Sequence, residues 1–248
     1  MWTHIDLFSG IGGFALAAQW AGFKTVVFCE NNKWLCNGLR KAWPTVPIEN
    51  DARKFDGTKW AGCTLLTAGV PCQPASRAGK QCGANDNRWL WPEALRIIAE
   101  ARPTWALLEN PLGIEDVGLD RILSDLESLD YEVGPPLEIP ACALNAPHRR
   151  TRLWILAHSV SIGRTWRRTT SEQEKKHAIS YPSRSRRSPW RNYSYILFER
   201  GEKGRIKPGV CGMAYGVSRK LLEALGNAIV PQVAYEIMKA IRKSKAER

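Results

Sequence analysis

The stretch WTHIDLFSGIGGFALAAQWAGF, residues 2–23, combines a strand pattern, a glycine-rich turn and a helix pattern in that order. Trp2–Phe8 is β-branched and apolar, which predicts a strand. Apolar residues then recur at helical spacing from Phe14 to Ala21, which predicts a helix. Glycines in the turn allow the backbone to approach a ligand, and the helix N-terminus offers free N–H groups. The unit is typical of a nucleotide-binding α/β fold.

Acidic residues end the next two predicted strands. Thr25–Glu30 (TVVFCE) is a strand pattern whose last residue lies 20 positions after Gly10. An acid at this distance accepts hydrogen bonds from both ribose hydroxyls in dinucleotide-binding folds. Asp51 follows the apolar segment PIEN and ends a third strand in the same way. These spacings predict a nucleoside site, and a site for NAD fits them nearly as well.

A cysteine lies in the loop GVPCQPAS, Gly69–Ser76, directly after the apolar run CTLLTA, Cys63–Ala68. The run predicts a short buried strand. Pro71 and Pro74 fix φ and remove two backbone donors, so neither a strand ladder nor a helix continues through the loop. Cys72 is therefore expected at the carboxyl end of a strand, where open α/β sheets hold ligands. A free cysteine is more often a packing residue, so its meaning depends on its neighbours.

A further acid, Glu109, ends the predicted strand Thr104–Asn110. Because neighbouring parallel strands end at the same edge of a sheet, we expect Glu109 and Cys72 to lie close together, which is a catalytic arrangement. For Glu109 considered alone, a surface carboxylate is the alternative.

The other patterns complete an α/β series. Residues 88–103 and 115–131 predict helices, and residues 131–139 and 152–158 predict strands. Residues 219–243 predict a helix, the loop GNAIVP and a closing amphipathic helix, whose first turn suits Pro231.

Composition limits the classes of protein to consider. The 248 residues are enough for one substantial core. The seven cysteines lack paired spacing and form no CxxC pattern, so we expect free thiols, a reducing cytoplasmic setting and no metal site. The sequence has neither a signal-peptide pattern nor a run of about 18 apolar residues, so we expect no membrane association.

The net charge of +12 indicates a polyanionic partner. Most of this charge lies in residues 148–208, which hold 16 basic and 4 acidic residues. The segment is also rich in Ser and Thr and contains aromatic residues. We expect its Arg side chains to neutralise phosphates and to reach base edges. A partly disordered basic insert is the alternative.

Five stretches resemble, in order, the motifs of DNA (cytosine-5)-methyltransferases of the bacterial and phage type. They are DLFSGIGGF (Asp6–Phe14), GVPCQPAS (Gly69–Ser76), LLENPLG (Leu107–Gly113), APHRRTRLWILA (Ala146–Ala157) and LGNAIVPQVA (Leu225–Ala234). They resemble the family's S-adenosylmethionine loop, Pro-Cys loop, Glu-Asn-Val motif, Gln-Arg-Arg-x-Arg motif and closing motif. The chain departs from these motifs at Ala75, Pro111 and His148. These positions adjoin the expected catalytic groups, so they bear on rate more than on reaction type.

The resemblance implies an α/β protein with a Rossmann-like S-adenosylmethionine-dependent methyltransferase fold, a mostly parallel sheet and a small basic recognition region. Residues 1–158 would form the catalytic and cofactor-binding domain and residues 159–208 the recognition region. Residues 209–248 would return to the catalytic domain. The recognition region is short for this family, which implies a short or loosely read target, or help from a partner.

The resemblance also implies a mechanism. Cytosine C5 is a poor nucleophile until a group adds at C6, and a thiolate such as Cys72 is suited to that addition. The base must leave the duplex for this chemistry. Glu109 would hold N3 and the exocyclic amine. Arg150 and Arg152 would lower the pKa of the thiol, and Arg152 would contact the base or its phosphate.

The remaining implied contacts are as follows. The expected cofactor-binding residues are Phe8, Ser9, Gly10, Ile11, Gly12, Gly13, Glu30, Asn31, Asp51, Ala52, Pro71 and Asn227. The expected nucleic-acid contacts are Gln73, Ser76, Arg149, Arg164, Arg167, Arg168, Arg186 and Arg187.

The expected cofactor is S-adenosylmethionine, the expected substrate is double-stranded DNA, and a monomer is the default state. Two alternatives stay open: a tRNA-directed relative with the same cysteine chemistry, and a catalytically inactive nucleic-acid-binding relative. The Pro-Cys-Gln loop favours DNA. Retention of Cys72 and Glu109 counts against an inactive protein.

Overall fold

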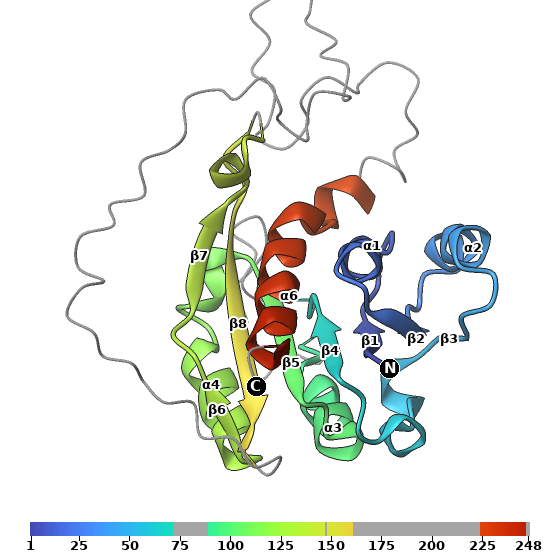
Figure 1. Ribbon diagram of the computed structural model, residues 1–248, viewed down its shortest axis with the longest axis horizontal. Helices are drawn as coiled ribbons and strands as arrows, with labels where there is room; N and C mark the ends of the chain where they lie inside the picture. The colour runs from blue at the N-terminus through green and yellow to red at the C-terminus, as the bar shows by residue number, and fades with distance from the viewer. Residues whose placement is uncertain (72–88, 147, 161–223, 247–248) are drawn as a thin grey trace, which may run out of the picture.

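The computed structural model describes residues 1–71, 89–146, 148–160 and 224–246 (Figure 1). Its strands form one eight-stranded sheet in the order β3-β2-β1-β4-β5-β8-β6, and β7 also pairs with β8. The strands are β1 (Thr3–Leu7), β2 (Lys24–Cys29), β3 (Ile48–Glu49), β4 (Leu65–Ala68), β5 (Trp105–Asn110), β6 (Tyr131–Val133), β7 (Leu137–Pro140) and β8 (Thr151–Ser159). The predicted α/β class with a mostly parallel sheet is confirmed.

Strands β1 to β5 run parallel to one another, and β8 runs antiparallel to β5. β1 lies between β2 and β4, so the chain builds the sheet first to one side of β1 and then to the other. The carboxyl ends of β1, β2, β4 and β5 therefore share one edge. In open α/β sheets, ligands bind at this edge, where the connections diverge.

Helices cover both faces of the sheet (Figure 1). The α-helices are α1 (Gly13–Trp20), α2 (Lys33–Ala42), α3 (Trp91–Ala101), α4 (Leu119–Ser128) and α6 (Pro231–Ala246). Short 3-10 helices are η1 (Ala52–Lys54), η2 (Gly57–Trp60), η5 (Leu112–Ile114) and η6 (Ala141–Leu144). The closing helix α6 begins at Pro231, as predicted.

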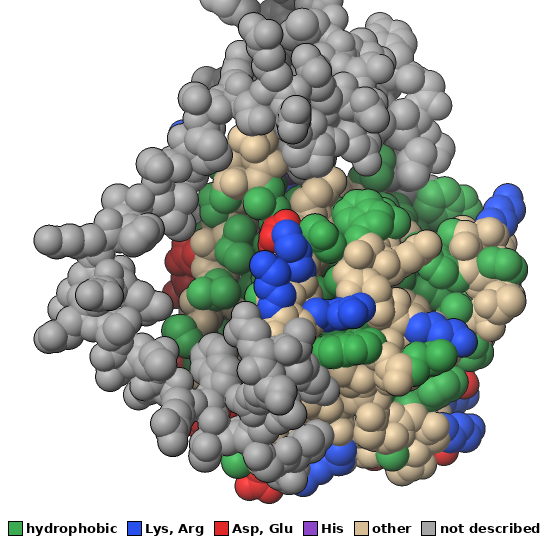
Figure 2. Space-filling model, in the orientation of Figure 1, with side chains coloured by type: hydrophobic (Ala, Val, Ile, Leu, Met, Phe, Trp, Pro, Cys, Tyr) green, Lys and Arg blue, Asp and Glu red, His purple; other side chains and the backbone are tan. Residues whose placement is uncertain are grey.

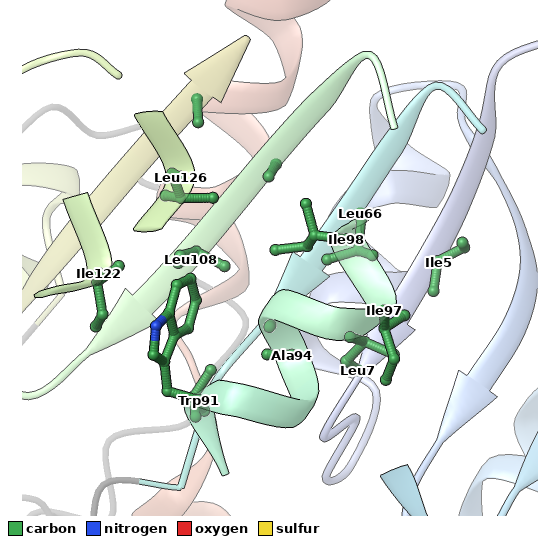
Figure 3. Close-up of a cluster of buried hydrophobic side chains, with 14 of the residues drawn as sticks. Ile5, Leu7, Leu66, Trp91, Ala94, Ile97, Ile98, Leu108, Ile122 and Leu126 are labelled. Atoms are coloured by element: carbon green, nitrogen blue, oxygen red, sulfur yellow. The ribbon is translucent and has the colours of Figure 1, made fainter. Parts of the chain in front are cut away.

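The larger core lies between the sheet and helices α3 and α4 (Figure 3). Trp91 and Ile98 of α3 pack over Leu66 and Leu108, which point from β4 and β5 toward the helices. All four side chains are almost completely buried. Burial of apolar surface of this kind is the main favourable term in folding.

The opposite face is covered by α1 and α6, whose packing joins the two ends of the described chain. Phe14 of α1 meets the edge of the Trp154 ring at 6.0 Å between centroids. Arg242 of α6 donates to the carbonyls of Ala21 and Gly22, at 3.0 Å each. Its guanidinium also lies 5.0 Å from the centroid of the Trp2 ring, in cation–π geometry.

Three details differ from the sequence-based expectation. Residues 131–139 form two strands, β6 and β7, both antiparallel to β8. The break falls at residues 134–136 (Gly-Pro-Pro), where two prolines provide no N–H for a ladder. Helix α2 was not predicted, and Asn32 caps its N-terminus by accepting from the N–H groups of Trp34 and Leu35. Residues 224–227 are helical, so the predicted loop GNAIVP begins within a helical turn.

No helix in residues 1–71, 89–146, 148–160 and 224–246 is long and apolar enough to span a bilayer. The predicted recognition region, residues 159–208, lies almost entirely outside the described residues, so the proposed domain boundaries remain predictions.

Candidate active site

A cavity of about 1390 Å³ opens at the carboxyl edge of the parallel strands. Its walls come from the loop after β1, the end of β2, residues 51–53, the end of β5, the start of β8 and residues 224–228. Segments that are distant in sequence thus meet around one space. The predicted residues Phe8, Gly10, Glu30, Asn31, Asp51, Ala52, Pro71, Glu109, Arg150, Arg152 and Asn227 all line it.

Glu30 organises one end of the cavity. One carboxylate oxygen accepts from the Gly10 N–H and the other from the Asn32 N–H, both at 2.8 Å. The side chain therefore ties the glycine-rich loop to the start of α2. Each carboxylate oxygen has a second lone pair, so the predicted role as an acceptor for ligand hydroxyls stays available.

The glycines of this loop serve different purposes. Gly10 has φ of 57°, and a Cβ built on it meets no atom within 4 Å, so open space adjoins this backbone. A Cβ on Gly12 would lie 2.6 Å from the Trp43 ring, and one on Gly13 would lie 2.8 Å from Ile229. Packing, rather than the approach of a ligand, therefore excludes side chains at Gly12 and Gly13.

The other predicted residues of this loop, Ser9 and Ile11, differ in their exposure. The Ser9 hydroxyl is buried and donates to the Asp6 carbonyl at 2.7 Å, which stabilises the turn. Ile11 is exposed. Both residues line a smaller adjoining cavity together with Gly13 and Asn227.

Asp51 lies at the rim of the same end of the cavity. Its carboxylate caps η1 by accepting from the Arg53 N–H at 3.0 Å. The backbone below it is held from α3, where Arg96 donates to the carbonyls of Ala52 and Phe55 at 2.8 and 2.9 Å. Arg96 also pairs with Glu93 and Glu100 of α3. It is a supporting residue that sequence reasoning missed, because no sequence pattern indicates its contacts with the two backbone carbonyls.

Glu109 lines the large cavity and also the smaller one beside the glycine loop. It lies on β5 with 7% of its surface exposed, and Arg152 of β8 places Nε 3.0 Å from Glu109 Oε1. Burial raises the pKa of Glu109, while the charges of Arg152 and Arg150 oppose this shift without cancelling it. A buried carboxyl of this kind holds a proton more readily than a free one and can donate it to a ring nitrogen.

The neighbouring arginines differ in their surroundings. The two terminal nitrogens of Arg150 donate to the carbonyls of Gly226 and Ala228, at 2.8 and 2.6 Å. Burial lowers the pKa of Arg150 to about 10, so it is a cation at neutral pH. Arg149 is exposed, as a residue that contacts a large polyanion would be. In Figure 2, which has the orientation of Figure 1, basic side chains lie beside an acidic one near the centre of the view, over helix α6.

Several predicted residues lie outside the described residues: Cys72, Gln73, Ser76, Arg164, Arg167, Arg168, Arg186 and Arg187. Pro71, which precedes Cys72, lines the cavity. The described chain therefore reaches the cavity one residue before Cys72, and the position of Cys72 stays a prediction. The main lining residue that the sequence did not reveal is Trp34, which is exposed in the first turn of α2.

Within the described ranges, no group of three or more His, Cys, Asp or Glu side chains is arranged to hold a metal ion.

Trp34 could have been suggested by its position shortly after the strand-end acid Glu30, but single aromatic residues carry little positional information.

Comparison with known proteins gives a consistent result. The family model for C-5 cytosine-specific DNA methylases matches residues 2–199. Type II methyltransferase M.NgoMIV of Neisseria gonorrhoeae is 43% identical over 115 residues, which are 46% of this chain and 37% of that protein. Type II methyltransferase M.PspPI of Psychrobacter sp. is 40% identical over 162 residues, which are 62% of this chain and 39% of that protein. The chain thus spans about two fifths of the length of these curated relatives.

Solved structures show the same fold. A protein described as a DNA modification methyltransferase from an Escherichia coli prophage aligns with a TM-score of 0.56 and 25% identity, covering 65% of this chain and 48% of that one. Spodoptera frugiperda DNMT2 aligns with a TM-score of 0.56 and 20% identity, covering 69% of this chain and 54% of that one. The second likeness concerns the fold alone.

Proposed function

The chain belongs to the family of C-5 cytosine-specific DNA methylases, and from this premise we propose that it transfers a methyl group from S-adenosylmethionine to C5 of cytosine in double-stranded DNA. The observation that carries the proposal is the pairing of two buried acids in one cavity. Glu30 lies with the open glycine loop, and Glu109 lies with Arg152. One end suits a nucleoside cofactor, and the other suits an amidine-like ring such as cytosine.

The cofactor end fits S-adenosylmethionine in its chemistry. Open space adjoins Gly10, and the Glu30 carboxylate retains lone pairs for ribose hydroxyls. Asp51 offers a carboxylate to the adenine amine, and Asn227 adjoins both cavities. When bound, this cofactor supplies an electrophilic methyl group on a sulfonium.

The protein side of the reaction follows from Glu109 and Cys72. We assign the Cys72 thiolate, by family resemblance, to addition at C6 of the flipped base, which forms an S–C6 bond and makes C5 nucleophilic. Glu109 donates its proton to N3 and so relieves the negative charge that builds up on the ring. After C5 has been methylated, a water molecule accepts the C5 proton as the S–C6 bond breaks and the thiolate leaves. N3 returns its proton to Glu109, which restores the aromatic ring and the starting state of the acid.

Arg152 has a dual role in this proposal. It holds the Glu109 carboxyl in a fixed orientation through the 3.0 Å contact. Its positive charge is also proposed to interact with the O2 carbonyl oxygen of the base and to favour the thiolate form of Cys72. Arg149 and the basic residues of the segment 159–208 are proposed to contact DNA phosphates, which predicts affinity that falls steeply with salt.

The test is methyl transfer from labelled S-adenosylmethionine to unmethylated genomic DNA, read by bisulfite sequencing, with Cys72→Ser in parallel. We expect 5-methylcytosine in a recurring context for the wild type and none for the variant. A tRNA sample treated in the same way is the comparison substrate. Methylation of tRNA alone would assign the RNA-directed alternative. Cofactor binding without methylation of either substrate would assign the inactive relative.

A further inference from the structure

We propose that Arg150 is a positioning residue that holds residues 226–228 beside the cofactor end of the cavity, rather than a group that contacts the base. The proposal rests on the proposed function for the identity of the cofactor. It concerns a residue whose sequence context suggests a catalytic role. Its partners in the fold indicate a different one.

The first observation is the bonding of the guanidinium. Nη1 of Arg150 donates to the Gly226 carbonyl at 2.8 Å, and Nη2 donates to the Ala228 carbonyl at 2.6 Å. The planar guanidinium presents its donors in a fixed fork, so two carbonyls on either side of Asn227 fix both the position and the tilt of this segment. Hydrogen bonds from a charged donor are stronger than neutral ones.

The second observation is the backbone of Arg150. Its φ is 25°, in the left-handed region that residues with a Cβ rarely adopt. Such conformations persist where surrounding contacts determine them. Here the residue directly precedes β8, and its side chain bonds to carbonyls that lie 76 and 78 residues later in the sequence.

The third observation is that the same segment contacts the cofactor loop. Ile229 adjoins residue 228 and packs so closely on Gly13 that an added Cβ there would lie 2.8 Å from it. Asn227, between the two anchored points, lines the large cavity and the smaller one formed with Gly10. The bonds of Arg150 and the packing of Ile229 on Gly13 therefore both restrain the segment that carries Asn227.

The two arginines thus have separate duties. Arg152 contacts the Glu109 carboxylate, whereas both terminal nitrogens of Arg150 are directed to backbone carbonyls. Because Arg150 directly precedes the strand that carries Arg152, it links the position of residues 226–228 to that strand. Cofactor affinity should therefore depend on Arg150, even without DNA.

The test measures the equilibrium dissociation constant for S-adenosylmethionine by calorimetry in the absence of DNA. Arg150→Met should weaken binding about tenfold, and Arg150→Lys, which offers one point donor in place of a fork, about threefold. Arg152→Met should leave cofactor affinity within about twofold while methyl transfer is lost. Arg121→Met, on the exposed surface of α4, is the matched control and should change neither quantity.

Steady-state kinetics provide the second measurement. Arg150→Met should raise KM for the cofactor about tenfold and leave kcat at saturating cofactor within about threefold. Unchanged cofactor affinity with a large fall in kcat would overturn the proposal and return Arg150 to the reacting base. If Arg150→Met does not fold, the same two measurements on Arg150→Lys decide between these outcomes. Failure of the wild type to bind S-adenosylmethionine would instead overturn the proposed function.

Discussion

Glu30 and Glu109 lie at the carboxyl ends of β2 and β5 and are equally buried, with 8% and 7% of their surfaces exposed. Their partners differ. Glu30 accepts from two neutral backbone N–H groups, whereas Glu109 faces a guanidinium at 3.0 Å. Glu30 thereby fixes the shape of a loop, whereas Glu109 is proposed to donate a proton to the base. Burial alone does not determine what an acid does, since the partner decides between a structural acceptor and an acid–base group.

Glu109→Gln is the most direct test of the separate roles of Glu30 and Glu109. The amide keeps the shape but has no proton to transfer, so methyl transfer should fall by about 10²- to 10⁴-fold. Cofactor affinity should stay within about twofold, because Glu109 pairs with Arg152 and not with the glycine loop that Glu30 holds. Single-turnover methylation and calorimetry measure the two quantities. A loss of cofactor affinity would show that the two acids do not have separate roles.

Glu30→Ala should produce the opposite pattern. It removes the acceptor for two backbone N–H groups and for the proposed ribose hydroxyls, so cofactor binding should weaken by about 1–3 kcal/mol. Methyl transfer at saturating cofactor should change far less than in Glu109→Gln. Glu127→Ala on the exposed face of α4 is the control. Unaltered calorimetric affinity for Glu30→Ala would rule out its assigned role.

The pH dependence of stability separates Glu109 from an ordinary carboxyl. Burial raises its pKa in the folded state above that in the unfolded chain, so the unfolded state releases its proton first. Its contribution to stability is therefore complete below the unfolded pKa and is lost as pH rises through the folded pKa. The melting temperature of Glu109→Gln relative to that of the wild type should rise as the pH is raised from 4 to 8. A constant difference across this range would contradict the raised pKa.

The smallest effect is expected for Asp51→Ala. The Asp51 side chain is 40% exposed, so water competes with any ligand for its carboxylate. Cofactor binding should weaken only about threefold. A loss of cofactor affinity equal to that of Glu30→Ala would mean that solvent exposure does not determine how much each acid contributes to cofactor binding. Asp51→Asn keeps an acceptor for the Arg53 N–H and serves as the control for loop structure.

Sequence patterns predicted the parallel sheet, its strand-end acids and the closing helix, because each depends on local periodicity or on a residue at a fixed distance from a strand. They did not predict α2, a short helix of which only Cys36 and Leu39 are buried. They also did not show that open space adjoins Gly10, whereas packing excludes a side chain at Gly12 and Gly13. This packing involves Trp43 and Ile229, which lie in other parts of the chain.

The contacts of Arg150 were equally inaccessible to sequence reasoning. Every residue except proline has the same backbone donor and acceptor, so no pattern identifies Gly226 and Ala228 as the acceptors. Arginines in a motif invite a catalytic assignment for all of them. Only the fold distinguishes the one that contacts an acid from the one that contacts a loop.

The packing of α6 on α1 has a consequence for the order in which the molecule is made. Arg242 bonds to a carbonyl 221 residues earlier, and Phe14, Ala17 and Ala18 share one buried cluster with Val233, Ala234 and Met238. During translation, the apolar face of α1 therefore leaves the ribosome long before the helix that covers it. The glycine loop that precedes α1 completes its surroundings only when this late segment docks. Cofactor-binding competence should consequently arise only after α6 has been synthesised, and a nascent chain halted before α6 should expose the apolar face of α1 to chaperones.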